Sequence, residues 1–474
     1  MRYISTRGTA PEIGFCDVLL AGLARDGGLY VPQTWPNKVA PAGVAAGVVA
    51  GVAAGDEIST SYANRAASIM APFVGDEIDA KVFQQLCVEA YSTFRHPDVA
   101  PLIEIAPDEY LLELFHGPTL AFKDVALQLV GKLFDHVLTQ RNERVMIVGA
   151  TSGDTGGAAF DGVASCRNVD IVMLYPNNRV SDVQRRQMTT LTASNVHAVA
   201  IDGTFDDCQD LVKAMFNDQK FRDANKLSAV NSINWVRVMA QVVYYFTALE
   251  KLGDSAVFSV PTGNFGNVLA GWIAKQMGAR IDGFVVASNT NDILTRFFES
   301  QQMTANDVVP TLSPSMDIQV SSNFERLLFE MNNRDGDLTT KQLTEFRSTG
   351  ELIVAPSIYA KWISGVFAGY RCNDEQTLAT MRDVYQQSGM LIDPHTAVGL
   401  SAARQSVGVN YPKNQSIITL ATAHPAKFPD AVRRATGQTP ELPEHLADLM
   451  SRPERVTSLP NNLKSVQAFV AKCC

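Results

Sequence analysis

From about residue 101 onward, short apolar runs rich in β-branched residues alternate with longer segments in which apolar positions recur every three or four residues. The runs predict strands at Leu111–Phe115, Val145–Gly149, Ile171–Leu174, Val196–Ile201, Val257–Val260, Phe284–Ala287 and Ile417–Leu420. The segments between them are long enough to form helices. This alternation predicts βαβ units and a largely parallel sheet, whose strands are apolar throughout because both faces are buried.

The first part of the chain has a different pattern. A segment rich in glycine, Asp26–Pro32, is followed by helical patterns that continue through Phe94. We therefore predict an N-terminal, mainly helical domain over residues 1–97. Residues 98–474 are predicted to form an α/β domain, which includes a smaller α/β subdomain at about 125–230.

The overall composition excludes several classes of protein. The chain has 474 residues, enough for about three folding units. Its hydrophobic fraction of 46% and charged fraction of 19% are ordinary for a globular protein and exclude a disordered one. With 40 Lys+Arg against 49 Asp+Glu and no basic run, we expect no nucleic-acid partner. A protein of net charge -9 can still contain a small basic pocket, so anionic metabolites remain possible substrates.

The cysteines and the N-terminus favour a cytoplasmic protein. Seven cysteines are scattered without a CxxC pair, and seven histidines without an HExxH motif, so we expect reduced thiols and no metal site. Residues 1–14 lack the apolar centre of a signal peptide. The uncharged stretch Val39–Gly55 is interrupted by Pro41 and is weakly apolar, so we predict a loop and a small-residue helix rather than a membrane span.

The first loop of chemical interest follows the strand Leu111–Phe115. A helical pattern begins near Phe122, so Lys123 lies at the start of a helix beside an apolar side chain. Burial and the positive end of the helix dipole both lower the pKa of a lysine, which favours an amine that forms a Schiff base. The alternative is an exposed lysine whose aliphatic stem covers apolar surface.

Two further loops join a strand to a helix and are rich in glycine and small polar residues. In Gly149–Gly157, hydroxyl and backbone N–H groups gather at a helix start, an arrangement typical of anion sites. The spacing is neither that of a P-loop nor GxGxxG. In Pro261–Asn267, glycine and asparagine permit positive φ, so that successive N–H groups can converge on a phosphate. The alternatives are a helix capped by Asp154 or Thr155 and an ordinary tight turn.

A fourth loop, Leu420–Phe428, follows the last predicted strand. Thr422 or His424 could face a ligand there, although a single histidine is more often structural. Because ligands bind beyond the carboxyl ends of parallel strands, we expect the chemistry of this protein in these four loops.

Together these motifs resemble the threonine synthase family in its long bacterial and fungal form. The matching segments, in order, are Thr6–Gly8, Asp26–Pro32, Phe115–Asp124, Thr151–Gly156, Asn231–Asn234, Gly263–Asn267 and Ala421–Phe428. The resemblance implies a pyridoxal-phosphate enzyme of fold type II (tryptophan synthase beta-like), with mostly parallel sheets flanked by helices and residues 98–474 as the catalytic domain. It also implies the last step of threonine biosynthesis, in which O-phospho-L-homoserine and water give L-threonine and phosphate.

The resemblance further implies roles for individual residues. Lys123 matches the lysine that holds the cofactor as an internal aldimine, and Thr422 matches the hydroxyl that hydrogen-bonds its pyridine nitrogen. The cofactor phosphate is assigned to Gly263, Asn264, Phe265, Gly266 and Asn267. The substrate carboxylate is assigned to Ser152, Gly153, Asp154 and Thr155. For the substrate phosphate the candidates are Asn234 and Arg237, the alternative for Arg237 being a surface ion pair on its helix.

Two other functions remain open at this point. A pyridoxal-phosphate-dependent serine or threonine dehydratase would share Lys123 and the Gly263–Asn267 loop but would lack a second phosphate site. A non-catalytic relative that only binds a ligand should have lost Lys123 or that loop, and this chain has both. For the other partners we expect a monomer or weak homo-oligomer that binds neither nucleic acid nor membrane.

Overall fold

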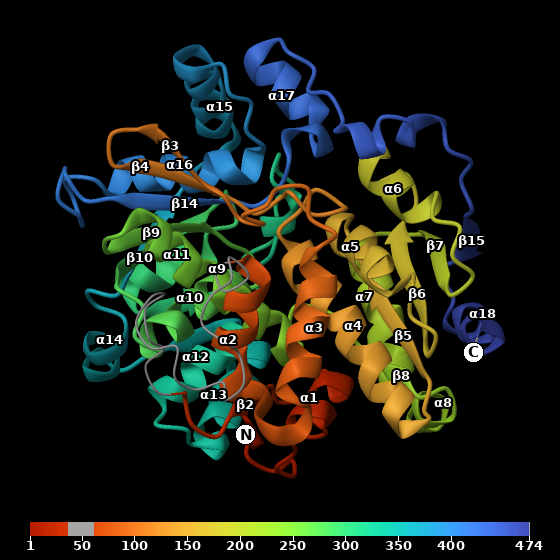
Figure 1. The fold of residues 1–474 in the computed structure, drawn as a ribbon. Helices are drawn as coiled ribbons and strands as arrows, with labels where there is room; N and C mark the ends of the chain where they lie inside the picture. Colours follow the sequence, from red (N-terminus) through yellow and green to blue (C-terminus); the bar gives the residue numbers. More distant parts are fainter. Residues whose placement is uncertain (37–60, 474) are drawn as a thin grey trace.

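Two β-sheets lie in separate parts of the molecule, with helices between and around them (Figure 1). The computed structural model describes residues 1–36 and 61–473, so the predicted loop and helix at Val39–Gly55 lie outside the described residues. The larger sheet has the strand order β13 (Phe367–Arg371), β10 (Ile281–Ser288), β9 (Ala256–Pro261), β14 (Ile417–Ala421), β4 (Glu109–Glu113) and β3 (Leu102–Ala106). The smaller sheet has the order β15 (Thr457–Pro460), β7 (Val196–Asp202), β6 (Val169–Pro176), β5 (Val145–Ala150) and β8 (Leu227–Ser228).

The strands of both sheets run in parallel, as the sequence predicts. Every neighbouring pair within the two sheets is parallel except β3 and β4, which form an antiparallel hairpin at one edge of the larger sheet. Two short antiparallel ribbons lie outside the sheets. They are β1 (Tyr3–Ser5) with β2 (Tyr30–Pro32), and β11 (Gln302–Thr304) with β12 (Glu351–Ile353).

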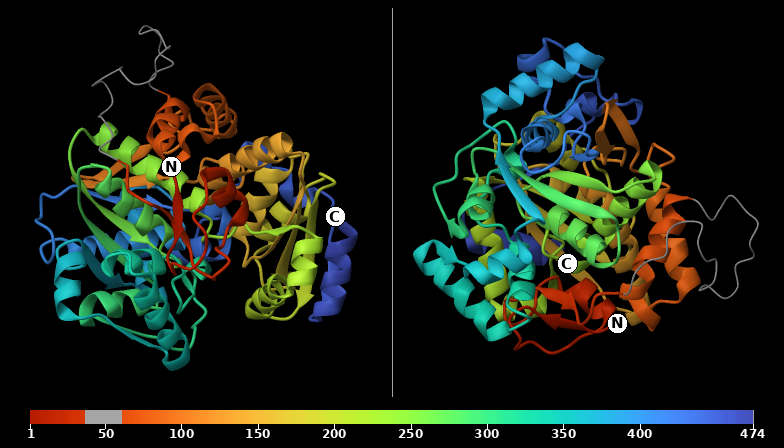
Figure 2. Two further views of the ribbon diagram at one scale, coloured as in Figure 1. Left: turned by 90° about the horizontal axis from the view of Figure 1, so that it is seen from below. Right: turned by 90° about the vertical axis from the view of Figure 1, so that its left-hand side faces the viewer.

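Helices cover both faces of the larger sheet, and Figure 2 shows them in two further views. Helices α9 (Trp235–Leu252) and α10 (Gly266–Gln276) pack on one face, and α16 (Pro394–Ser406) packs on the other. The remaining helices are α1 (Phe15–Ala21), α2 (Tyr62–Val74), α3 (Ala80–Tyr91), α4 (Lys123–Arg141), α5 (Asp154–Val163), α6 (Asp182–Thr189), α7 (Phe205–Asn217), α8 (Gln219–Ala224), α11 (Ile293–Ser300), α12 (Phe324–Met331), α13 (Gly336–Thr349), α14 (Pro356–Trp362), α15 (Asp374–Ser388), α17 (Pro429–Thr436) and α18 (Leu463–Cys473).

Helix α9 is the most deeply buried long helix of the core. It packs against α2, α4 and α10, and almost all of its residues are inaccessible to solvent. A helix that is apolar around its whole circumference is typical of such a central position. Two polar side chains interrupt the apolar surface, Arg237 and Gln241, and both are buried. Because burying a polar group without a partner is unfavourable, these two positions require an explanation.

Helices α4 and α5 cross in unusually close contact. A Cβ atom added to Gly131 would lie 1.8 Å from the carbonyl oxygen of Gly162, and one added to Gly162 would lie 2.5 Å from the carbonyl of Leu127. Glycine at these two positions therefore permits direct contact between the backbones of the helices. Each contact glycine lies about two turns beyond the first residue of its helix, so the two helix starts are also neighbours.

The N-terminal segment packs against α12. The hydroxyl of Thr6 donates to Oε1 of Glu325 at 2.6 Å, and Nε of Arg326 donates to the carbonyl of Tyr30 at 2.9 Å. Helix α12 follows directly after Asn323, whose side chain donates to the carbonyl of Asn264 at 3.0 Å. The segments Thr6–Gly8 and Asp26–Pro32 are thus linked to the loop after β9, although they lie far from it in the sequence.

Each of the seven predicted strands is present, with its ends shifted by a few residues at most. The sequence analysis did not identify β3, β8, β13 and β15, which are short edge strands with polar or glycine residues and therefore lack a continuous apolar run. Strand β15 and helix α18 come from the end of the chain and complete the smaller sheet (Figure 1). The division of the chain at residue 97 and the subdomain at about 125–230 stay predictions.

Candidate active site

The three central strands β9, β14 and β4 are adjacent and parallel, so the loops at their carboxyl ends meet at one edge of the larger sheet. These are the loops that contain Gly263–Asn267, Thr422 and Lys123. The fourth predicted loop, which contains Asp154, follows β5 in the smaller sheet. Its helix α5 packs on α4, and this contact brings it to the same place.

Backbone hydrogen bonds join the loop before Lys123 to the loop after β14. The N–H of Phe122 donates to the carbonyl of Thr422 at 2.9 Å, the N–H of His424 donates to the carbonyl of Leu120 at 3.0 Å, and Ala121 and Ala423 form a β-bridge between them. Lys123 and Thr422 therefore lie on adjoining backbone segments. The hydroxyl of Thr422, which is 5% exposed, makes no hydrogen bond within the described residues.

The side chain of Lys123 is buried at the first position of α4. Its Nζ atom lies 3.2 Å from Oδ2 of Asp154 and 3.5 Å from the hydroxyl of Ser315. Burial lowers the pKa of this amine, the carboxylate of Asp154 opposes the effect, and the charges of Lys427 and Arg237 lower the pKa further. The alternative of an exposed lysine on an apolar surface is therefore wrong, and the site contains an amine with a reduced tendency to hold its proton.

Asp154 is the centre of a buried cluster of charges. Besides Lys123, its carboxylate accepts hydrogen bonds from Nε2 of Gln184 at 2.8 Å and lies 2.9 Å from Nζ of Lys427. Burial by itself would raise the pKa of Asp154, but the two lysines hold it well below the usual range. The carboxylate is therefore ionised and faces cations. The alternative of Asp154 as a helix cap is not observed, because Gly153 occupies the cap position.

The loop after β9 has a strained residue at its centre. Phe265 has φ 60° and ψ 8°, in the left-handed region, and it immediately precedes the first residue of α10. This turn points successive N–H groups in one direction. No hydrogen bond within the described part of the chain uses the backbone N–H groups of residues 264–267. Unpaired N–H groups at the positive end of a helix of 11 residues fit a phosphate group.

The space beside Gly266 is also suited to a phosphate. A Cβ atom added there would meet only Oε1 of Gln241 at 3.5 Å and Nδ2 of Asn323 at 3.6 Å, both of which are polar side-chain atoms. By contrast, the side chain of Asn267 is already held by a hydrogen bond from the hydroxyl of Tyr244 at 3.0 Å. The loop therefore fits the cofactor phosphate chiefly through its backbone. Its remaining polar contacts would come from neighbouring helices.

Arg237 is a buried cation without a counter-ion. It is 3% exposed, it pairs with no carboxylate of the described residues, and its Nε atom has no hydrogen-bond partner. Its Nη1 atom donates to the carbonyl of Val230 at 3.0 Å. Burial lowers the pKa of its guanidinium to about 10. The alternative of a surface ion pair is wrong, and an unpaired buried guanidinium fits a phosphate dianion.

The side chain of Asn234 is fully used within the protein. Its Oδ1 atom accepts from the N–H of Val236 at 3.0 Å and so caps α9, and its Nδ2 atom donates to the carbonyl of Leu19 at 3.0 Å. The structure brings Asn234 close to Arg237, but only Arg237 has unmet hydrogen-bonding capacity. Asn234 thus positions the start of the helix from which Arg237 projects.

The loop after β5 offers hydroxyl and N–H groups. The hydroxyl of Thr151 accepts from the N–H groups of Gly153 and Gly156, both at 3.0 Å, which shapes the turn. Gly153 has φ 142°, and a Cβ atom on it would lie 2.5 Å from Gln184. The hydroxyls of Ser152 and Thr155 make no hydrogen bond with the described residues and are partly exposed. They therefore fit a substrate carboxylate better than the anionic Asp154 does.

Several side chains at this site were not given a role by the sequence analysis. Lys427 lies within a motif that matched the family, but nothing in the pattern indicated that it contacts Asp154. Ser315 comes from an irregular segment with no sequence signal, and its N–H donates to Nε2 of His395 at 3.3 Å. His395 is in turn held through Nδ1 by Asp393 at 2.9 Å. His424, which the sequence left open as a ligand, uses one ring nitrogen within its own loop, because Nδ1 accepts from the N–H of Ala426.

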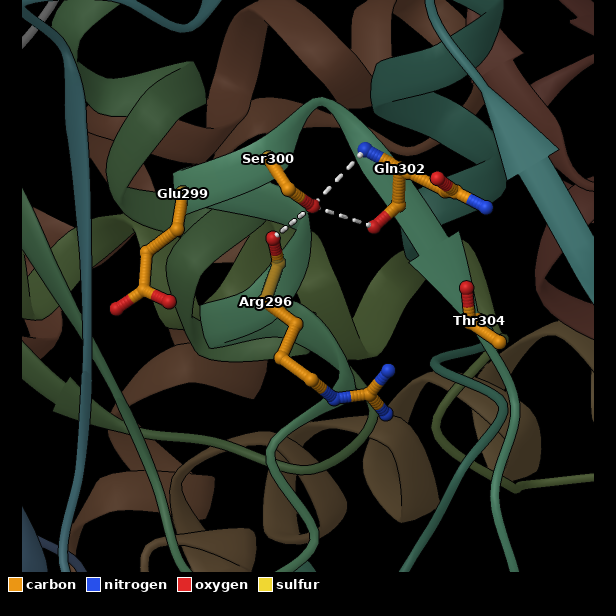
Figure 3. A pocket seen from close by; sticks show the side chains of 5 residues that line it. All are labelled: Arg296, Glu299, Ser300, Gln302 and Thr304. Atoms are coloured by element: carbon orange, nitrogen blue, oxygen red, sulfur yellow. Dashed lines mark hydrogen bonds between the residues drawn. The ribbon is translucent and has the colours of Figure 1, made fainter.

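A surface pocket lies elsewhere, beside the C-terminal end of α11, and contains none of the predicted site residues (Figure 3). Its lining includes Arg296, Ser300 and Gln302, and the hydroxyl of Ser300 donates to the carbonyl of Arg296 at 2.7 Å. These contacts end the helix and do not converge on a ligand. Among the described residues, no helix is both long and apolar enough to cross a membrane.

Comparison with known proteins identifies the family. Models of three families match the chain: threonine synthase N terminus over residues 2–91, pyridoxal-phosphate dependent enzyme over residues 103–348, and threonine synthase, C-terminal, over residues 396–470. Threonine synthase from Pseudomonas aeruginosa is 51% identical to this chain, and the match covers 100% of the chain and 98% of that protein. The chain belongs to the threonine synthase family.

Solved structures of threonine synthases agree with this assignment. The structure of threonine synthase from Brucella melitensis with bound pyridoxal phosphate has a TM-score of 0.92 and 49% identity, and the match covers 100% of this chain and 99% of that one. Yeast threonine synthase has a TM-score of 0.90 and 37% identity, with 100% and 98% coverage. The expected fold of a type II pyridoxal-phosphate enzyme, with mostly parallel sheets flanked by helices, is confirmed. The match over residues 103–348 makes this threonine synthase family member a pyridoxal-phosphate-dependent enzyme.

Proposed function

We propose that this protein is a carbon–oxygen lyase that converts O-phospho-L-homoserine and water to L-threonine and inorganic phosphate. The observation that carries the proposal is Arg237, a buried guanidinium that has no counter-ion among the described residues, in a protein whose loop after β9 offers further unpaired donors, its backbone N–H groups, for the cofactor phosphate. A substrate with its own phosphate group would provide the negative charge and the hydrogen-bond acceptors that this guanidinium lacks. A serine or threonine dehydratase acts on substrates without phosphate and has no use for such a group.

The cofactor would be held at three points. Lys123 is the amine that binds it covalently, the backbone N–H groups of Gly263–Asn267 bind its phosphate, and the hydroxyl of Thr422 hydrogen-bonds its ring nitrogen. Thr422 is neutral and can act as donor or acceptor, so it does not force this nitrogen to remain protonated. When bound, pyridoxal phosphate supplies an electron sink for carbanions formed on the substrate.

The protein groups would hold the substrate and move its protons. Ser152, Gly153 and Thr155 bind the substrate carboxylate, with Asp154 shaping the loop beside Lys123. The reaction requires proton removal at Cα and Cβ, loss of phosphate from Cγ and addition of water at Cβ. With substrate bound, the amine of Lys123 would carry protons between these carbons. Its low tendency to stay charged suits a group that both accepts and returns a proton.

The test measures products from two kinds of substrate. Purified protein with pyridoxal phosphate should release phosphate from O-phospho-L-homoserine and form L-threonine in equal amounts, as measured by chromatography. With L-serine or L-threonine it should form little 2-oxo acid. Rapid 2-oxo acid formation without phosphate-dependent threonine formation would identify a dehydratase instead. Absence of both reactions, with the cofactor bound, would indicate the non-catalytic alternative.

We also propose a cytoplasmic location and a monomeric or weakly associating state. The cytoplasmic location is supported by the scattered cysteines, most of which are buried. Light scattering across a range of protein concentrations would test the state of association. A stable oligomer at low protein concentration would contradict the proposed monomeric or weakly associating state.

A further inference from the structure

Two lysines share one buried carboxylate at the active site. Oδ2 of Asp154 lies 3.2 Å from Nζ of Lys123, and Oδ1 lies 2.9 Å from Nζ of Lys427. Lys427 has no exposed surface, and Asp154 is 5% exposed. A buried ion pair needs one cation for each anion, but here two amines compete for the same anion.

The other charged groups around the cluster do not restore the balance. Arg237 adds a further positive charge that acts on Lys123. On the side of Lys427, burial lowers the pKa of His424 to about 4, so this imidazole is neutral near pH 7. Burial raises the pKa of Asp124 to about 7, so this carboxyl is only partly ionised there. Gln184 and Ser315, which also donate hydrogen bonds to Asp154, carry no charge. With both lysines protonated, the cluster would contain excess buried positive charge, which is relieved if one lysine loses its proton.

The hydrogen bonds indicate which lysine stays charged. Nζ of Lys427 donates to the carbonyl of Thr119 at 2.7 Å and lies 2.9 Å from the carboxylate of Asp154. Both are short contacts to strong acceptors. Lys123 has a longer contact with Asp154 and a hydroxyl contact at 3.5 Å. An ammonium ion is stabilised by close acceptors, so of the two lysines Lys123, with the longer contacts, is the one that more readily loses its proton.

We propose that Lys427 is the resident counter-ion of Asp154, and that by occupying this carboxylate it leaves Lys123 as the uncharged amine that bonds to the cofactor. Lys427 is thus a positioning residue, since it acts through Asp154 on Lys123. The proposal rests on the role proposed for Lys123 above. In the step concerned, the Lys123 amine first gives a proton to solvent. Its lone pair then forms the C–N bond with the aldehyde carbon, and the aldehyde oxygen leaves as water with the two remaining amine protons.

The experiment follows the pH dependence of cofactor attachment. The full-length protein is stripped of cofactor and reloaded with pyridoxal phosphate, and the rate of covalent attachment is followed by absorbance at a series of pH values. Borohydride reduction and peptide mass spectrometry then identify the lysine that carries the adduct. In Lys427→Met, Lys123 no longer shares Asp154, so its ammonium form is stabilised. The pH midpoint should rise by about one unit, which lowers the rate below the midpoint about tenfold.

A second variant tests the same charge balance in the opposite direction. In Asp154→Asn, which keeps the shape of the side chain, Lys123 faces only cations, and the midpoint should fall below that of the unchanged protein. If Lys427→Met does not fold, Asp154→Asn by itself tests the counter-ion proposal. Lys341→Met, in the exposed part of α13, is the matched control and should leave the midpoint unchanged.

The outcomes separate the two proposals. An adduct on a lysine other than Lys123 overturns the role of Lys123 and that of Lys427 with it. An adduct on Lys123 with an unmoved or lowered midpoint in Lys427→Met leaves the role of Lys123 intact and overturns the counter-ion proposal. An unmoved pH midpoint in Asp154→Asn overturns the counter-ion proposal as well.

Discussion

Lys123 and Asp154 are the first residues of two neighbouring helices, and their side chains meet at 3.2 Å. The two helix starts are held together by direct backbone contact between α4 and α5 at Gly131 and Gly162. A helix start favours an anion and disfavours a cation. Asp154 is therefore stabilised in its charged form by its position, whereas Lys123 is destabilised in its charged form. The pairing provides both a fixed carboxylate and an amine that can lose its proton.

Lys123→Ala should abolish covalent attachment of pyridoxal phosphate, because the other lysine of the cluster, Lys427, is held by short contacts to Asp154 and to the carbonyl of Thr119. The variant should lack the yellow chromophore of the bound cofactor. Borohydride reduction followed by mass spectrometry should find no adduct. A stable adduct on another lysine, such as Lys427, would contradict the assignment of Lys123.

Gly266→Val should weaken cofactor binding with little loss of stability. Gly266 does not have a positive φ, and an added Cβ would meet no atom closer than 3.5 Å, so the protein can accommodate it. The side chain would instead fill the space proposed for the phosphate. Equilibrium dialysis would measure cofactor affinity, and thermal unfolding without cofactor would measure stability.

Gly263→Ala provides the contrast to this variant. Its Cβ would lie 2.6 Å from the carbonyl of Ser315, so the neighbouring loop must move. We expect a loss of about 1–3 kcal/mol in the free energy of unfolding, as is typical of overpacking. Equal cofactor affinities for Gly266→Val and the unchanged protein would show that the phosphate binds elsewhere.

Thr422→Val should retain the cofactor and slow turnover. The hydroxyl of Thr422 has no partner among the described residues, and valine matches the shape of threonine without the hydroxyl, so the fold should be unaffected. The lost hydrogen bond to the ring nitrogen is worth about 0.5–1.5 kcal/mol, or roughly a twofold to thirteenfold decrease in kcat. Unchanged kcat would argue against this contact, and a structure with a carboxylate at the ring nitrogen would rule it out.

Arg237→Met should weaken phosphate binding while leaving the ligand-free protein as stable as before, or more stable. The guanidinium is buried without a counter-ion, so an apolar side chain of similar length removes a desolvation cost. The KM for O-phospho-L-homoserine should rise steeply, whereas inhibition by an analogue without phosphate should barely change. Reduced cofactor affinity with unchanged KM would assign Arg237 to the cofactor phosphate instead.

Asp124→Asn should flatten the pH dependence of stability between about pH 4 and pH 7. Burial raises the pKa of Asp124 to about 7, with hydrogen bonds from Thr119 opposing the effect. The folded state therefore binds more protons than the unfolded state in this range, and the contribution of Asp124 to stability decreases as the pH rises from 4 to 7. Over this pH range the contribution of Asp124 to the free energy of unfolding falls by up to about 4 kcal/mol. Urea unfolding at several pH values would measure it, and equal slopes for the two proteins would contradict the prediction.

The sequence alone predicted the parallel sheets because buried strands have continuous apolar runs of β-branched residues. Seven strands were located in this way, and they include β4, β5, β9 and β14, whose loops contain the candidate site residues. The edge strands β3, β8, β13 and β15 were not identified. Only one side of an edge strand pairs with another strand, so its sequence can contain polar residues and glycine. Their place in the fold is determined by pairing with strands far away in the chain.

The sequence also predicted which loops carry the chemistry, because four strand-to-helix loops contain a lysine, glycines and small polar residues at positions where ligands bind in parallel sheets. The roles of Lys123, the Gly263–Asn267 loop and Thr422 were implied by the resemblance to the threonine synthase family. Only the tertiary structure placed Lys427 and Gln184 on Asp154, Gln241 beside Gly266, and Ser315 beside Lys123. Only the tertiary structure showed that Arg237 is buried and has no carboxylate partner among the described residues. Local patterns determine backbone geometry over a few residues, whereas the charge of a buried group depends on side chains that are distant in the sequence and are brought together only by folding.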